Sequence, residues 1–178
     1  MWQTIIDFWY LELAPKQWFE NNLQINQLIA QRFGKLHKQA AAGELYIWRQ
    51  KPLGRLAEII VLDQFSRNLH RDSALAFAND AMALALAQEA ISQSADQGLT
   101  KVQKQFLYMP FMHSESLFIH QQAEILFNGL GEPYGSKHEA LHKAIIERFG
   151  RYPHRNSILG RESTAEELRF LQQPDSSF

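Results

Sequence analysis

Arginine and histidine gather in residues 148–161 in a pattern that could bind anions. This stretch holds four arginines and one histidine and contains no acid. Guanidinium groups beside turn glycines and a proline suit bidentate recognition of a carboxylate or phosphate. The alternative is that these arginines pair with Asp63, Glu115 and Glu162 and attach the last helices to the body. Charged hydrogen bonds of roughly 1.5–3 kcal/mol each are sufficient for that role.

A second polar segment, residues 62–71, places Asp63, Arg67 and Arg71 at intervals of four residues. On one helix they would form a single strip at the edge of the apolar face. The strip could be a row of solvent-exposed ion pairs, each contributing about 0.3–0.5 kcal/mol. Alternatively, the strip could direct an arginine side chain into a binding cleft. Together, the two segments hold six of the chain's ten arginines.

A third segment, residues 109–116, ends in His113-Ser114-Glu115-Ser116. The spacing predicts a helix over 113–128, with His113 and His120 on one face. Ser114 or Glu115 could simply cap that helix, since exposed backbone N–H groups at a helix start need an acceptor. A histidine with a carboxylate close by could alternatively act as a general acid–base pair.

The sequence His138-Glu139-Ala140-Leu141-His142 matches the H-E-x-x-H pattern of zinc proteases. Glu166 or Glu167 could be offered as a third ligand. The match begins two residues into a helix and no strands are expected nearby to hold a substrate, so we keep zinc hydrolysis only as a minor alternative and expect no metal. No Walker loop, G-x-G-x-x-G, G-x-S-x-G or paired C-x-x-C occurs, so we expect no cofactor.

The bulk composition indicates one globular domain over residues 1–178. With 178 residues, 46% apolar and 21% charged, the chain can bury a core without disulfides, and it has no cysteine. A net charge of −1 argues against a general nucleic-acid or membrane-surface binder. The aromatic N-terminus lacks the basic start of a signal peptide, so we expect a cytoplasmic protein.

Prolines, glycines and caps divide the chain into helices, and no segment alternates with the period of a strand. The expected helices cover 15–33, 39–42, 52–69, 73–91, 99–109, 113–128, 136–149 and 163–172. Short loops predict antiparallel neighbours, and therefore an all-α stack of helix pairs, a tetratricopeptide-like α–α superhelix. No clean repeat of about 34 residues supports that last detail.

The polar segments also carry a family resemblance over the whole length of the chain. The chain resembles the uncharacterised bacterial family DUF924, which implies a tetratricopeptide-like stack of helices but transfers no activity. In the family pattern, His142 has a counterpart more readily than His138, which weakens the zinc alternative. The segments that carry the resemblance are Phe8–Tyr10, Pro15–Phe19, Leu62–Arg71, Tyr108–Glu115, Arg148–Asn156, Gly160–Thr164 and the tail Pro174–Phe178. The motif-like positions are Asp63, Gln64, Arg67, Asn68, His113, Ser114, Glu115, Arg148, Arg151, His154, Arg155 and Asn156.

Three hypotheses follow. In the first, the polar segments form one cleft that binds a small anion, a phosphate or a carboxylate, with hydrolase or transferase chemistry equally open. In the second, the domain binds an acidic peptide or a protein. In the third, the motifs are ion-pair networks that fix the fold. The candidate catalytic residues are His113, Glu115, His154 and Asp63. The candidate ligand-binding residues are Arg67, Asn68, Arg148, Arg151, Arg155 and Asn156. The oligomeric state is left open.

Overall fold

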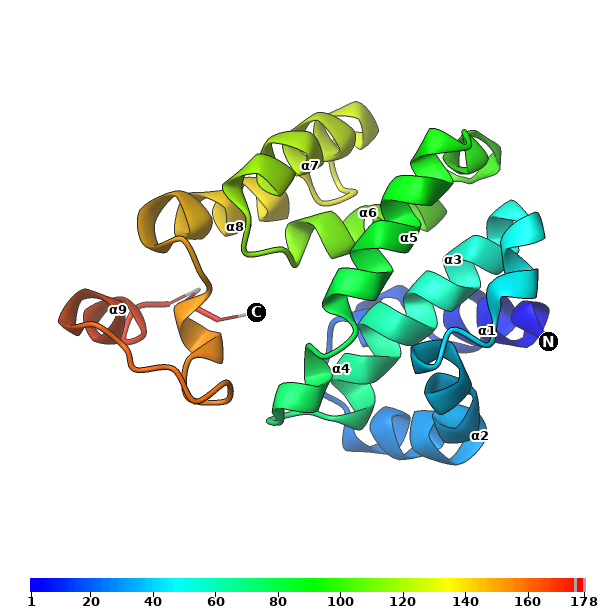
Figure 1. Ribbon diagram of the computed structural model, residues 1–178, viewed down its shortest axis with the longest axis horizontal. Helices are drawn as coiled ribbons and strands as arrows, with labels where there is room; N and C mark the ends of the chain where they lie inside the picture. Colours follow the sequence, from blue (N-terminus) through cyan, green and yellow to red (C-terminus); the bar gives the residue numbers. More distant parts are fainter. Residues whose placement is uncertain (175, 178) are drawn as a thin grey trace.

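A computed structural model describes residues 1–174 and 176–177, and over this range the chain is helical with no strand. Asp175 and Phe178, which belong to the tail motif, lie outside the described residues. Figure 1 shows α3 beside α1 and α5 in one part of the molecule, with α7, α8 and α9 on the other side. The α-helices are α1 (Trp2–Asp7), α2 (Leu23–Ala41), α3 (Pro52–Ile60), α4 (Ser66–Leu69), α5 (Asp80–Ser92), α6 (Lys101–Met112), α7 (Leu117–Leu130), α8 (Ser136–Phe149) and α9 (Ala165–Phe170).

Shorter helical turns connect these elements. Two are π-helical, η1 (Phe8–Glu12) and η4 (Val61–Phe65). The others are 3-10 turns: η2 (Pro15–Trp18), η3 (Tyr46–Gln50), η5 (Ala74–Ala76), η6 (Ala95–Gly98) and η7 (Pro153–Arg155).

The central run from α3 through η4 to α4 is the predicted helix that begins at Pro52. It packs against α1, α2, α5 and α6, and every residue from Leu56 to Ser66 is buried. The π turn inserts an extra residue into the helix, and π-bulges of this kind are frequent at functional sites. Here it carries Asp63 into the interior.

The aromatic residues of the N-terminal half form the core beside this run. Trp9 lies 5.7 Å from Phe65 and 5.4 Å from Phe106 between ring centroids, and Phe33 lies 5.4 Å from Phe65. Phe8 is also fully buried, 5.0 Å from Phe33. Large rings dominate the apolar area of a core, so the aromatic Phe8–Tyr10 segment is a packing element.

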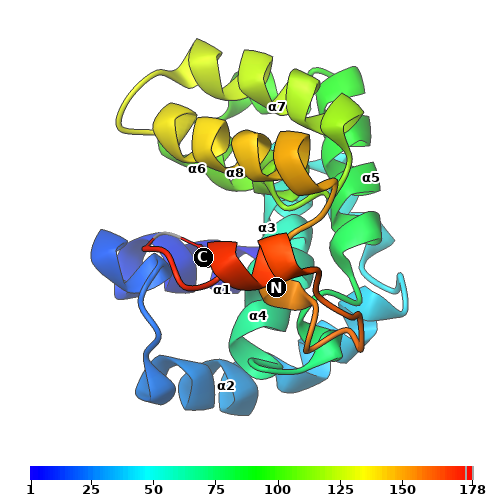
Figure 2. The same cartoon turned by 90° about the vertical axis from the view of Figure 1, so that its left-hand side faces the viewer.

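The second half is a series of neighbouring helices in which α5 packs on α6, α6 on α7 and α7 on α8. Close approach is possible because the buried positions of α5 are Ala83, Ala87 and Ala90. After α8 the chain turns at Gly150, whose φ of 68° suits a glycine at a helix end. It then returns through η7 toward α4 and α5, as Figures 1 and 2 show.

Several predicted boundaries were wrong. The helix at 23 does not stop at Gly34, which sits inside α2, because a single glycine costs a helix only about 1 kcal/mol. Pro110 does not end α6, which runs to Met112. Residues 113–116 form a loop instead of the first turn of a helix, so His113 does not share a helix face with His120.

Candidate functional site

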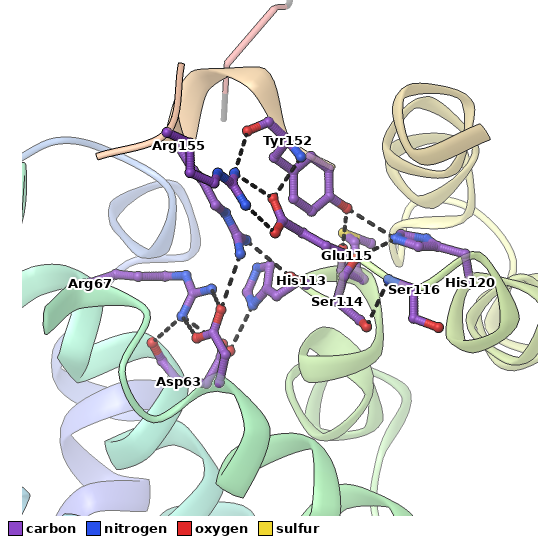
Figure 3. Close-up of polar contacts among 12 residues, drawn as sticks. Asp63, Arg67, His113, Ser114, Glu115, Ser116, His120, Tyr152 and Arg155 are labelled. Atoms are coloured by element: carbon purple, nitrogen blue, oxygen red, sulfur yellow. Dashed lines mark hydrogen bonds and ion pairs between the residues drawn. The ribbon is translucent and has the colours of Figure 1, made fainter. Parts of the chain in front are cut away.

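The three polar segments of the sequence meet at one place in the fold (Figure 3). Asp63 comes from η4 and Arg67 from α4. His113 and Glu115 come from the loop between α6 and α7, and Arg155 from η7. Contacts between side chains far apart in sequence therefore join the central helix to the C-terminal part of the chain.

The carboxylate of Asp63 is the buried centre of this cluster, with 1% of the residue exposed. Its Oδ1 lies 2.7 Å from His113 Nδ1, and its Oδ2 accepts a hydrogen bond from Gln64 Nε2 at 2.5 Å. Arg67 Nη1 lies 3.3 Å from Oδ1 and donates to the Asp63 backbone oxygen at 2.9 Å. Burial alone would raise the pKa of Asp63, but Arg67 and His113 hold it well below its usual range. The carboxylate is therefore charged.

This geometry fixes the proton on the His113 ring. Burial, followed by the charge of Arg67, lowers the pKa of His113, so the imidazole is neutral near pH 7. An ionised carboxylate can only accept, so Nδ1 carries the proton and donates to Asp63. Nε2 then holds a lone pair and has no partner among the described residues, and 15% of the His113 side chain is exposed. A carboxylate-oriented imidazole with an accessible Nε2 is the arrangement of a general base.

Two guanidiniums lie beside this imidazole and share one carboxylate. Asp80, at the start of α5, accepts from Arg67 through Oδ1 at 2.9 Å and through Oδ2 at 3.1 Å. Its Oδ2 also accepts from Arg155 Nη1 at 3.3 Å, and Arg155 Nη2 donates to the backbone oxygen of His113 at 3.0 Å. The Phe77 ring lies under both cations, 4.4 Å from Arg155 and 5.7 Å from Arg67.

Charge within this group balances. Arg67 and Arg155 are offset by Asp63 and Asp80, and a neutral His113 adds nothing. The buried Nε–H of Arg155 has no acceptor among the described residues. Burial, and then the charge of Arg67, lowers the pKa of Arg155, which reflects the crowding of two cations at one site.

Glu115 ties the loop to the segment after α8. It accepts from Arg161 at 2.6 and 2.8 Å and from the backbone N–H of Tyr152 at 2.7 Å. Arg161 Nε in turn donates to Asn156 Oδ1 at 3.0 Å. Glu115 was a candidate catalytic residue, but its two oxygens serve a bidentate ion pair, which suits a structural tie.

A second histidine, His120, is fully buried behind the loop. Its Nδ1 lies 2.7 Å from Glu139 Oε1, and its Nε2 lies 2.8 Å from the backbone oxygen of Ser114 and 3.1 Å from Tyr152 Oη. Tyr152 Oη donates to the backbone oxygen of Met112 at 2.6 Å. Because the Ser114 oxygen can only accept, Nε2 is a donor, and one proton is shared between Nδ1 and Glu139. These bonds hold the loop that presents His113.

The H-E-x-x-H segment does not form a ligand set. Glu139 is engaged with His120, and His142 Nδ1 lies 2.8 Å from the backbone oxygen of His138. The two carboxylates offered as third ligands, Glu166 and Glu167, are paired with arginines instead. Across the described residues, no three His, Cys, Asp or Glu side chains are grouped as a metal site.

The remaining predicted residues separate into other roles. Arg151 binds Glu167 at 2.6 and 2.8 Å and also donates to the backbone oxygen of Glu162, while Arg148 pairs with Glu166. These pairs attach α9. The hydrogen bond from Arg151 lowers the pKa of Glu167 to about 2.

Three other predicted positions lie around the edge of the cluster. Asn156 is fully buried and donates to Ser163 at 3.0 Å. The ring of His154 lies 5.6 Å from that of Tyr152, and burial, then the charge of Arg155, lowers the pKa of His154 to about 4. Asn68 faces away from Asp63, donating to Asn26 on α2 at 2.8 Å.

Sequence reasoning missed two residues of the cluster, Asp80 and Phe77. An acid in the first turn of a helix and an aromatic residue in an alanine-rich segment are both ordinary features, so neither position signals that two arginines will converge on it. Arg71, predicted to extend the strip of Asp63 and Arg67, lies past the end of α4 and is exposed.

Comparison with known proteins supports the fold and leaves the activity open. Residues 5–175 match the family described as "Bacterial protein of unknown function (DUF924)". A solved structure of a protein of unknown function from Agrobacterium tumefaciens is similar, with 38% sequence identity, a TM-score of 0.92 and coverage of 96% of each chain. No curated relative matches. Within the described residues, no helix has the length and apolar character needed to cross a membrane.

Proposed function

We propose that this chain, which belongs to the DUF924 family, binds a small carboxylate or phosphate at the Arg67–Arg155 pair and exchanges a proton with it through His113. The observation that carries the proposal is the partly exposed, neutral imidazole of His113, which is anchored 2.7 Å from Asp63, lies beside two guanidiniums and has no partner for Nε2 among the described residues. Buried titratable groups with shifted pKa values next to charge partners are a physical signature of functional sites.

The position of Asp80 supports the choice of an anion. Its carboxylate already bridges both guanidiniums, and 18% of its side chain is exposed. A ligand oxyanion would make the same kind of contacts by displacing Asp80 or by binding beside it. Arginine presents its donors in a planar fork that fits carboxylate and phosphate groups.

The charge balance predicts how binding and protonation are linked. An anion added to the neutral group of two arginines and two aspartates leaves one negative charge in excess. Protonation of His113 at Nε2 removes this excess and supplies a further donor. The ligand is therefore bound together with a proton, and its affinity falls by up to about tenfold per pH unit as the pH rises from the pKa of free His113 to its higher pKa in the complex.

In catalysis, the protonated His113 of the complex would donate its Nε2 proton to a leaving group, and Arg67 and Arg155 would stabilise the negative charge that develops. Asp63 positions the ring and stabilises its protonated form. Both hydrolysis and group transfer can use this set of residues, and the proposal covers either reaction.

We also propose a tetratricopeptide-like stack of helices and a cytoplasmic location. The succession of α5 on α6, α6 on α7 and α7 on α8 supports a tetratricopeptide-like stack in this half of the chain. The absence of cysteine from all 178 residues is compatible with a reducing, cytoplasmic location.

The test is thermal unfolding against phosphate, sugar phosphates, nucleotides, dicarboxylates and divalent metals. A ligand at 100 times its Kd adds about 2.7 kcal/mol to the stability, a shift of several degrees for a chain of this size. Arg155→Lys should abolish the shift, because lysine keeps the charge but loses the fork. The exposed Arg169→Lys is the matched control and should retain it. No shift with any anion, or a shift that survives Arg155→Lys, would refute the proposal.

A further inference from the structure

A second polar hollow lies on the α2 side of the molecule, separate from the His113 cluster. Two adjoining cavities of about 610 and 420 Å³ share Ala30 and Leu69, so they form one groove between α2 and the end of α4. We call it the α2 groove. Beyond the shared residues, the larger part is lined by Asn21, Leu23, Asn26, Gln27, Asn68, Arg71 and Asp72, and the smaller by Gly34, Lys35, His37, Lys38 and His70.

Helix α2 forms one wall and sets the length of the groove. Asn26, Ala30, Gly34 and Lys38 follow one another at intervals of four residues, which places them on one face of the helix. At 1.5 Å per residue, Asn26 to Lys38 spans about 18 Å. An extended peptide rises about 3.3 Å per residue, so about five residues fit this length. The small Ala30 and Gly34 leave room for a backbone.

The amide pair Asn26 and Asn68 offers the hydrogen-bonding pattern of a peptide group. Asn68 Nδ2 donates to Asn26 Oδ1 at 2.8 Å. That bond leaves an N–H₂ group on Asn26 and a carbonyl oxygen on Asn68, neither with another partner among the described side chains. Exchanging O and N on both amides leaves the same set, one donor and one acceptor. A peptide unit presents the complementary C=O and N–H.

The charge lining the groove is positive although the whole chain carries −1. Lys35, Lys38 and Arg71 face it with Asp72 as the single acid, which gives a formal charge of +2 with the histidines neutral. Lys35, Lys38 and Arg71 form no ion pair with the described residues. This contrasts with Arg67 and Arg155, which are held by internal acids. Cations without an internal partner favour a negatively charged occupant.

We propose that the α2 groove binds an extended peptide segment of about five residues that carries acidic side chains. The amides of Asn26 and Asn68 hydrogen bond to the peptide backbone, and Lys35, Lys38 and Arg71 bind the carboxylates. The site is independent of the His113 cluster, because Arg67 and Asn68 point to opposite partners, Asp80 on one side and Asn26 on the other.

The experiment is fluorescence anisotropy of the full chain with a labelled Glu-Ala-Glu-Ala-Glu peptide. Peptides with Gln or Lys in place of Glu, and a labelled oligothymidine, serve as competing probes. Lys38→Glu reverses one exposed charge and should lower the affinity for the acidic peptide by about fivefold. Replacing both Asn26 and Asn68 by Ala should weaken it by roughly fivefold through the lost backbone contacts. Lys137→Glu, an exposed charge reversal on α8, is the matched control and should leave binding unchanged.

The outcomes separate the alternatives. The proposal is supported if only the acidic peptide binds, both groove variants weaken it and circular dichroism shows them folded. It is overturned if no peptide binds, if the Gln or Lys peptide binds as tightly, or if oligothymidine binds as tightly, which would make the groove a general polyanion surface. Binding that Lys38→Glu leaves unchanged also overturns it. Because Arg155→Lys does not touch the groove, it should leave peptide binding intact even if the anion site fails.

Discussion

At the scale of single residues, the buried carboxylate of Asp63 holds the cluster together, with His113 Nδ1 at 2.7 Å and Arg67 Nη1 at 3.3 Å from its Oδ1. Its type and spacing to Arg67 predicted an ion pair, which the structure contains at 3.3 Å. Of the two interpretations left open for this strip, the row of solvent-exposed ion pairs is excluded, because the π turn buries Asp63 to 1% exposure. The sequence could not predict the role of Asp80, because only the fold brings its carboxylate to Arg67 and Arg155.

Replacing Asp63 by Asn should lower the free energy of unfolding by about 3 kcal/mol or more. Asparagine keeps the shape but leaves Arg67 and His113 without their buried carboxylate, and breaking a buried ion pair typically costs 3–5 kcal/mol. Urea unfolding measures the change, with the exposed Asp7→Asn as a control expected within about 0.5 kcal/mol. A loss below about 1 kcal/mol for Asp63→Asn would contradict the view that this carboxylate anchors the cluster.

Among the elements, the helices themselves were largely predictable, while their ends and junctions were not. Pro52, Ser136 and Gly150 mark real helix boundaries. Gly34 and Pro110 do not, because packing against neighbouring helices outweighs a local penalty of about 1–3 kcal/mol. The loop at 113–116 could not be seen either, since it depends on the buried His120–Glu139 pair and on Tyr152.

Two glycines with contrasting surroundings test the packing of the helices. In α3, a methyl group at Gly54 would overlap the backbone oxygen of Trp48, so Gly54→Ala should destabilise by about 2–3 kcal/mol. In α2, Gly34 has open space around it, and Gly34→Ala should stabilise by about 0.5–1 kcal/mol through helix propensity. Both are measured by urea unfolding. Equal effects of the two changes would show that the packing of α3 on η3 is not as described.

The junction made by Glu115 predicts a local change in dynamics. Glu115→Ala removes the acceptor of the Tyr152 N–H and the partner of Arg161. Amide hydrogen exchange at Tyr152 should accelerate by roughly tenfold or more, as expected for a lost charged hydrogen bond. The N–H of Leu107 in the middle of α6 should be unaffected. Unchanged exchange at Tyr152 would mean that the segment after α8 docks without Glu115.

For the whole molecule, the all-α class follows from the helical period of the sequence and agrees with the helical structure and the 0.92 TM-score of the solved relative. The single domain over residues 1–178 stays a prediction. The spacing of the polar residues could not decide between a binding cleft and structural ion-pair networks. All four arginines that the sequence singled out as ligand-binding pair with internal acids, and only the geometry separates the two near His113 from the two that attach α9.

The histidines make the stability of the whole molecule sensitive to acid. Burial lowers the pKa of four histidines. It lowers the pKa of His142 to about 3 and that of His154 to about 4, and it also lowers the pKa values of His37 and His113. Between these values and about 6.5 the unfolded chain binds more protons, so stability falls as pH drops below about 6.5. Glu139 has the opposite effect, because its pKa is raised in the folded protein, but it is a single group.

Urea unfolding between pH 8 and pH 5 checks this prediction. The free energy of unfolding should decline steadily below pH 6.5. A constant or rising stability down to pH 5 would mean that the folded protein accepts protons on these histidines as readily as the unfolded chain does, which contradicts the prediction.

The most direct test of the proposed anion site is the protonation of His113 itself, followed by NMR of the histidine ring nitrogens from pH 8 to pH 5. Spectra are recorded alone, with inorganic phosphate and with succinate, using the exposed His138 as an internal reference. Without ligand, His113 should be neutral with its proton on Nδ1 and a pKa below 6.5. One of the two anions should raise that pKa, because binding takes up a proton. If His113 carries its proton on Nε2, or neither anion moves its titration, the proposed anion site is contradicted.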